Sequence, residues 1–134
     1  MNQTNIVSLW LEACPSFKTA FAESCTEHGS ELLYLHASAF ARHLLDLHRL
    51  QKKDEFASVA VFLEGLYTDV DPATREFATI GILEGIQNVW EHSEVSPNEF
   101  LPYLLPASAA AWRSLDQFWS EDIPFIPDTH HLPS

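Results

Sequence analysis

Residues 72–91, PATREFATIGILEGIQNVWE, decide the fold class of this 134-residue chain. Apolar residues recur along this stretch at helical spacing, which predicts one long helix with a buried face and an exposed face. The face predicted to lie inward carries small and aliphatic residues: Ala78, Ile82, Gly85, Ile86 and Val89. The opposite face, which we call the acidic stripe, has one aliphatic residue in its middle: Glu76, Ile80, Glu84, Gln87 and Glu91.

A second long helix is predicted over residues 30–51, SELLYLHASAFARHLLDLHRLQ. Apolar residues cover most of its circumference, while Glu31, Arg42, Asp46 and Arg49 gather on one side. Such a wide apolar arc is typical of a helix that packs against several neighbours. We therefore expect this helix to lie in the middle of the domain.

Prolines, capping residues and a glycine divide the chain into about seven helices. The fixed φ of proline suits the first turn of a helix, and Asp71 is a typical N-cap. Gly29 is expected to end the helix before it. The predicted helices span residues 4–13, 16–28, 30–51, 54–68, 72–91, 97–105 and 107–121. We expect one all-α domain over residues 1–134, built of stacked antiparallel helices, with an irregular proline-rich tail from about residue 122 to 134.

The predicted helices 54–68 and 72–91 form a hairpin, joined by the short turn TDVD. The pattern D-P-x-x-R-x-x-A, which begins at Asp71, resembles the start of the second helix of a HEAT-type repeat. The resemblance implies that Asp71 caps this helix and that Arg75 pairs with acidic groups near the turn. Asp69 and Asp71 are the candidate partners of Arg75. The middle of the chain is therefore expected to be a HEAT-like hairpin.

The charge balance restricts the class of partner. The chain has 7 basic and 19 acidic side chains, a formal net charge of −12. This balance argues against binding to nucleic acid or to an anionic membrane, because both depend on Lys and Arg. Residues 68–134 hold 2 basic and 11 acidic groups, and no Lys or Arg lies between Arg75 and Arg113. Glu94 and Glu99 lie in the same interval. Two interpretations of this acidic surface stay open: a solvated face that keeps the protein soluble, and a docking surface for a protein with a basic surface.

Motifs of the common enzyme classes are missing from the sequence. It contains no G-x-S-x-G elbow, no glycine-rich phosphate loop and no Cys or His spacing of the common zinc modules. We therefore expect no enzyme, no catalytic residue, no metal and no cofactor. His36 and His43 lie seven residues apart on the predicted central helix. Structural histidines are the simpler interpretation, and a hydrolase or metal enzyme that uses them stays an open alternative.

Cys14 and Cys25 are predicted to be free, packed thiols. The sequence has no recognisable signal peptide or membrane-spanning run, which indicates a cytoplasmic protein, and the cytoplasm keeps thiols reduced.

His130 and His131 lie in the predicted tail, where they could bind metal adventitiously. An exposed Ile80 would also be compatible with a homodimer.

Four blocks of sequence, taken in order, resemble a known group of proteins: SLWLEACPSF, LLYLHASAFARHLLDL, DPATREFATIGILEGIQNV and LPASAAAWRSLDQFW. They resemble a family of small, acidic, all-helical bacterial proteins, some of whose members are encoded beside polymorphic toxins. The resemblance spans most of residues 7–119 and implies an immunity protein that binds a cognate toxin domain and occludes its active surface. On this hypothesis the acidic stripe binds the toxin, with Glu94 and Glu99 at its rim. A helical interaction adaptor unrelated to toxins is the alternative.

Overall fold

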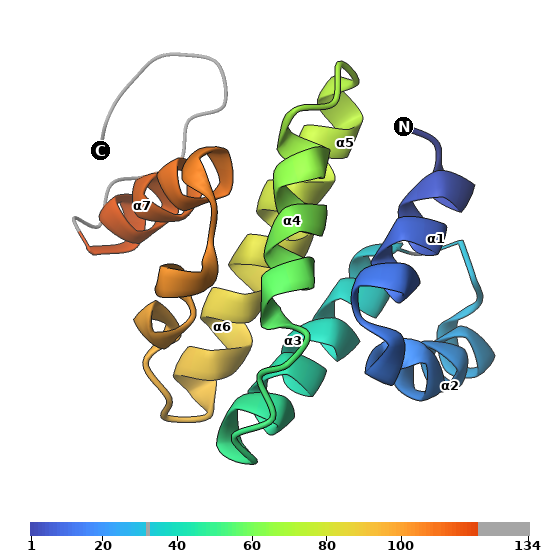
Figure 1. Ribbon diagram of the computed structural model, residues 1–134, viewed down its shortest axis with the longest axis horizontal. Helices are drawn as coiled ribbons and strands as arrows, with labels where there is room; N and C mark the ends of the chain where they lie inside the picture. Colours follow the sequence, from blue (N-terminus) through green and yellow to red (C-terminus); the bar gives the residue numbers. More distant parts are fainter. Residues whose placement is uncertain (32, 121–134) are drawn as a thin grey trace.

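The computed structural model describes residues 1–31 and 33–120, and these residues form helices and turns without any strand (Figure 1). The all-α fold class predicted from the sequence is therefore confirmed. The predicted tail, with His130 and His131, lies outside the described residues. The α-helices are α1 (Gln3–Ala13), α2 (Lys18–His28), α3 (Leu33–Arg49), α4 (Phe56–Tyr67), α5 (Pro72–Glu76), α6 (Glu84–His92) and α7 (Pro106–Ser120). The remaining segments are the 3-10 turns η1 (Pro15–Phe17), η3 (Pro97–Glu99) and η4 (Leu101–Tyr103), and the π-helical segment η2 (Phe77–Leu83).

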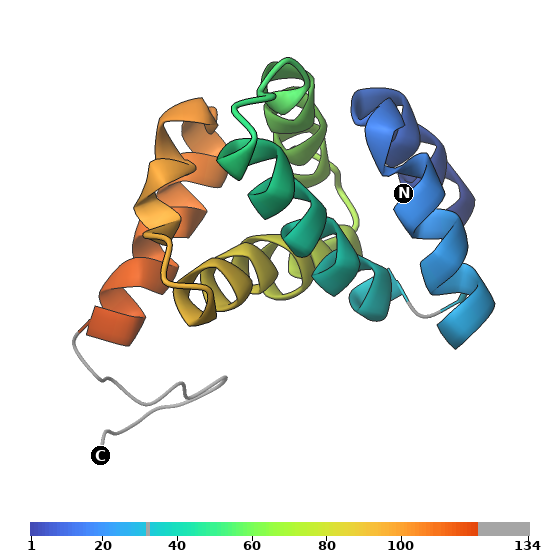
Figure 2. The same cartoon turned by 90° about the horizontal axis from the view of Figure 1, so that it is seen from below.

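Helix α3 lies in the middle of the domain, as its wide apolar arc predicted. It contacts α2, η2 and α6, and Figure 2 shows it crossing the molecule with α1 and α2 on one side and α7 on the other. Helix α4 packs against both α1 and α7. The described helices include none that is long and apolar enough to cross a lipid bilayer.

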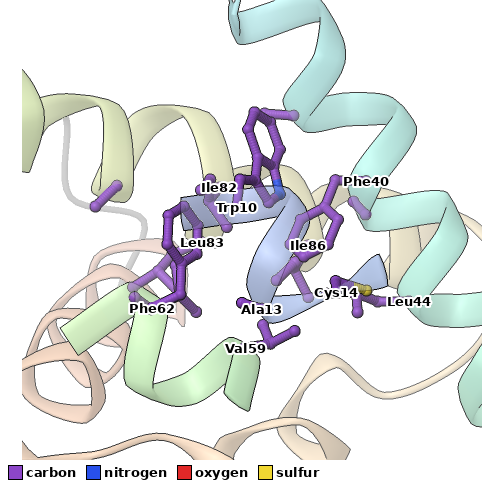
Figure 3. Close-up of a cluster of buried hydrophobic side chains, with 14 of the residues drawn as sticks. Trp10, Ala13, Cys14, Phe40, Leu44, Val59, Phe62, Ile82, Leu83 and Ile86 are labelled. Atoms are coloured by element: carbon purple, nitrogen blue, oxygen red, sulfur yellow. The ribbon is translucent and has the colours of Figure 1, made fainter. Parts of the chain in front are cut away.

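Trp10 of α1 occupies the centre of the core and has no exposed surface (Figure 3). Its indole contacts aromatic rings from five other segments, with ring centroids 5.3–6.2 Å apart: Phe17, Phe21, Phe40, Phe62 and Phe77. Large aromatic side chains bury the most apolar area per residue, so this cluster supplies much of the driving force for folding. A second group of buried rings, around Trp90, Phe100 and Trp112, fills the space under α7.

The predicted helix 72–91 is continuous, but it is not a regular α-helix along its whole length. Residues Phe77–Leu83 form a π-helical segment between α5 and α6. A π-helix pairs residue i with residue i+5, so it inserts one residue and turns the following face by about 100°. In a straight α-helix, Ala78 and Trp90 would point about 120° apart. Both side chains are completely buried here, because the inserted residue brings Trp90 round toward the core.

The turn between α4 and α5 confirms one expectation and corrects another. The Asp71 side chain accepts a hydrogen bond from the backbone N–H of Ala73 at 3.0 Å, so it caps α5 as predicted. The Arg75 guanidinium donates to the backbone carbonyl of Asp69, and no contact with either predicted carboxylate is formed among the described residues. A neutral carbonyl therefore takes the place of the expected ion pair. The hairpin of α4 and the helix after it is present.

The predicted helix over residues 97–105 is wrong, since the chain forms the two 3-10 turns η3 and η4 there. Pro102 would have stood inside that helix, where its missing N–H and its ring break the hydrogen-bond ladder. Phe100 between the two turns is completely buried and holds this segment against Trp90. The segment therefore closes the core without a full helix.

Helix α7 is held to α4 by one carboxylate. Glu64 of α4 accepts hydrogen bonds from the backbone N–H groups of Ala107 at 2.7 Å and Ser108 at 3.0 Å, and from the Ser108 hydroxyl at 2.9 Å. Burial alone would raise the pKa of Glu64, but these hydrogen bonds outweigh it and hold the pKa below its ordinary value of 4.5. Glu64 therefore acts as an N-cap from a neighbouring helix and fixes where α7 begins.

Glu64 predicts a specific dependence of stability on pH. Its pKa is lower in the folded state, so its contribution is complete above the ordinary value and is lost as the pH falls through the lower folded value. We expect Glu64→Gln to lower the free energy of unfolding by roughly 1 kcal/mol at pH 7, as for other cap losses. The difference between the two proteins should shrink toward pH 3 in urea titrations. A constant difference over this pH range would contradict the capping role.

Two glycines offer a matched test of the π-helical segment. A Cβ atom at Gly81 would lie 2.8 Å from the ring of Phe77, which is itself packed in the core, whereas a Cβ at Gly65 meets nothing within 4 Å. We expect Gly81→Ala to destabilise the protein by roughly 1–3 kcal/mol through overpacking. Gly65→Ala should stabilise it by roughly 0.5–1 kcal/mol. Thermal unfolding followed by circular dichroism measures both, and equal effects would contradict this packing.

Candidate functional site

The acidic stripe lies on the outer side of the α5–η2–α6 segment, but the π-helical segment divides it. Glu76 and Glu91 are exposed, Ile80 is 43% exposed, and Glu84 is half-buried. Burial raises the pKa of Glu84 above its ordinary value. The stripe therefore has two exposed ends and a partly covered middle.

Gln87 is buried, contrary to its predicted place on the exposed face, although it contributes to the wall of the acidic hollow described below. Its side chain is only 4% exposed, and its amide nitrogen lies 3.5 Å from the backbone oxygen of Trp112 in α7. A regular α-helix would place Gln87 on the same face as Ile80. The residue inserted by η2 turns Gln87 toward α7 instead.

The first end of the stripe is an apolar surface with acidic neighbours. Tyr34 is 46% exposed and Leu35 is 41% exposed, both at the start of α3. The Tyr34 ring stands perpendicular to the ring of Phe77, with centroids 5.4 Å apart, and lies close to Gly81, the residue after Ile80. Burial raises the pKa of Tyr34, and the charge of Glu76 raises it further.

A hollow of about 460 Å³ opens beside this apolar end, and Tyr34, Leu35, Glu76 and Phe77 contribute to its wall. Neither Tyr34 nor Leu35 was predicted to lie at the surface. The signal that could have shown them is the wide apolar arc of residues 30–51, because more apolar residues lie on it than the neighbouring helices cover.

The second end of the stripe is an acidic hollow of about 370 Å³. Glu91 and Glu94 line it from the end of α6 and the turn that follows, and Asp116 lines it from α7. Glu94 has a φ of 63°, a left-handed conformation that is costly for a residue other than glycine. Asp116 was not among the predicted site residues, since its place beside Glu91 depends on the packing of α7.

Glu99 has a partner within the chain. Its carboxylate accepts a hydrogen bond from Nε2 of His48 at 2.6 Å, and the imidazole stacks on Trp90. The Glu99 side chain is nevertheless 52% exposed, so one contact with α3 leaves much of it at the surface. Glu99 therefore helps to position the loop after α6 in addition to contributing negative charge.

The two histidines of the open enzyme alternative have different environments. His36 is completely buried: its Nε2 donates to the Gly29 carbonyl at 2.9 Å, so its Nδ1 accepts from the Ser24 hydroxyl at 2.6 Å. Burial lowers the pKa of His36, and both ring nitrogens are used, as expected for a structural histidine. His43 is half-buried and lies 2.7 Å from the hydroxyl of Ser16.

Both cysteines are free thiols, as the sequence predicted. Cys14 is completely buried at the end of α1, and Cys25 is half-buried on α2. The fold brings Cys14 close to Glu55, with 3.1 Å between Sγ and Oε1. This juxtaposition links residues 41 positions apart, and sequence spacing gave no sign of it.

Residues 7–120 match the model of a protein family described as Domain of unknown function (DUF7674). The match covers most of the chain, from α1 to the end of α7, and so includes the acidic stripe. No curated protein and no solved structure matches the chain.

Proposed function

The chain belongs to the DUF7674 family, and we propose that it is a cytoplasmic immunity protein that binds a cognate bacterial toxin domain and blocks its active surface. One observation supports the proposal above the others. Exposed glutamates and the exposed Ile80 lie along α5–η2–α6, in a half of the chain that carries a formal net charge of −9, and the exposed Tyr34 and Leu35 of α3 lie beside them. A surface of this composition suits a protein partner with basic and apolar groups.

The two ends of the stripe would serve different purposes in such a complex. Tyr34, Leu35 and Ile80 supply exposed apolar area, and aromatic side chains in particular are frequent binding hot spots. Glu91, Glu94 and Asp116 supply a negative potential that accelerates encounter with a basic protein. Neutralisation would then follow from steric cover of the toxin, without any chemical step on it.

A helical adaptor unrelated to toxins is the second candidate. The exposed apolar side chains at the start of α3 favour it equally, because such a patch indicates a protein interface without specifying the partner. A homodimer through Ile80 is a further arrangement of the same patch. The identity of the bound protein separates these alternatives: a toxin domain supports immunity, a housekeeping complex supports the adaptor, and a second copy of the chain supports the homodimer.

Charge reversal at the second end of the stripe tests the proposal. The tagged protein is first used to capture its stoichiometric partner from the native host, and the partner is then purified. We expect the double variant Glu91→Lys/Glu94→Lys to bind this partner roughly tenfold more weakly, mainly through slower association. Surface plasmon resonance at low and at high ionic strength measures the two rate constants.

Glu23→Lys/Glu27→Lys is the matched control, because it makes the same change in charge at two exposed glutamates of α2, away from the stripe. It should leave the association rate close to that of the unchanged protein. Circular dichroism should show the same helix content for all variants. Unchanged binding by the double variant, or an equal loss in the control, would exclude the second end of the stripe as the binding surface.

A further inference from the structure

Four polar side chains from three segments meet beyond the end of α1. They are Cys14 and Ser16 around the start of η1, His43 of α3, and Glu55 directly before α4. The Sγ of Cys14 lies 3.1 Å from Oε1 of Glu55, and the hydroxyl of Ser16 lies 2.6 Å from the same oxygen. The ligand atoms of Cys14, His43 and Glu55 all lie within 4.8 Å of one another.

The directions of these hydrogen bonds argue against a nucleophile activated by His43. An ionised carboxylate only accepts, so the Ser16 hydroxyl and the Cys14 thiol both donate to Glu55. The proton of Ser16 is thus directed to Glu55, and Nε2–H of His43 must donate to the Ser16 oxygen at 2.7 Å. In an activated Ser–His pair the hydroxyl donates to the imidazole instead.

The same three donor atoms suit a divalent metal ion. We infer that Cys14, His43 and Glu55 form a zinc site, with the thiolate, the imidazole and the carboxylate as ligands. Zinc binds sulfur, nitrogen and oxygen donors in a tetrahedron, and sites with three protein ligands keep the fourth position for water or another oxygen. Tetrahedral ligand atoms lie roughly 3.3–3.7 Å apart at ordinary zinc–ligand distances. Movements of about one ångström would bring the three atoms into this geometry.

In the free protein, two of the three ligands are in the protonation state that zinc binds. Burial would raise the pKa of Glu55, but hydrogen bonds from Ser16 and Cys14 outweigh it, and the pKa lies below its ordinary value. Burial lowers the pKa of His43, which keeps the imidazole neutral. Burial and the contact with Glu55 raise the pKa of Cys14 to about 12. Zinc would therefore displace one proton, that of the Cys14 thiol.

The site has a closed and an open side. Cys14 is completely buried, whereas His43 and Glu55 are half-buried and Ser16 is exposed. An ion can therefore enter past Ser16, whose hydroxyl contacts all three ligand side chains and would turn aside as the ion binds. Because the ligands come from α3 and from both sides of the α1–α4 contact, a bound ion would stabilise the packing of these helices.

Cobalt is the probe for this inference, because Co²⁺ occupies zinc sites and a thiolate ligand gives it a charge-transfer band in the near ultraviolet. Full-length protein is treated with chelator and titrated with Co²⁺, and then with Zn²⁺ as competitor. We expect one equivalent of cobalt, a thiolate band, and loss of this band on addition of zinc. Zinc should also raise the thermal unfolding midpoint, as any ligand of the folded state does.

Substitutions identify the ligands. Cys14→Ser should abolish the thiolate band, and His43→Gln and Glu55→Gln should each weaken zinc binding at least tenfold, since even outer residues of metal sites have effects of about this size. Cys25→Ser and the double variant His130→Ala/His131→Ala are the controls, because they remove a thiol and two histidines that are not among the proposed ligands. Both should bind like the unchanged protein.

Three results would overturn the zinc site. One is the absence of a thiolate band in the unchanged protein, and another is a band that persists in Cys14→Ser but is lost in Cys25→Ser. The third is zinc binding that disappears only with His130 and His131, which would place the ion in the tail. Cys14 is completely buried, so Cys14→Ser could fail to fold. His43 and Glu55 are half-buried and can be replaced with little disturbance of the core, so zinc binding by His43→Gln and Glu55→Gln then tests the site.

Discussion

The burial of Trp10 is the constraint on which the arrangement of the helices depends. Its indole contacts aromatic rings from η1, α2, α3, α4 and η2, so five segments must meet at one point. One of these rings belongs to Phe77, the first residue of the π-helical segment. The segment after it must also place Trp90 in the second part of the core, where its N–H donates to the Ala41 carbonyl. The irregular helix satisfies both contacts.

The residue inserted by η2 also decides which side chains of this helix reach the surface. Up to Ile80 the predicted outer face is exposed, whereas Gln87 is turned inward against α7. The acidic stripe thus consists of an apolar end beside Tyr34 and an acidic hollow beside Asp116. The proposed binding surface has two chemically different parts as a result, and each part combines residues from two helices.

The sequence predicted the elements that depend on local chemistry. The Asp71 cap, the end of a helix at Gly29 and the central position of α3 followed from capping rules and apolar spacing. What could not be predicted arises from tertiary contacts. The π-helical segment forms because Phe77 and Trp90 must both be buried. The contact of Cys14 with Glu55 exists only after α1 and α4 pack. The wrong helix over residues 97–105 could have been avoided from the sequence, since Pro102 would stand in its interior.

Hydrogen exchange of the chain, with and without its captured partner, shows which surface the partner covers. Backbone amides that a partner covers exchange more slowly, and the technique maps them along the whole chain. We expect protection to concentrate at the start of α3, in η2, and from α6 to the turn at Glu94, while α2 exchanges as in the free protein. Protection confined to α1 and α2, with the stripe unchanged, would contradict the proposed binding surface.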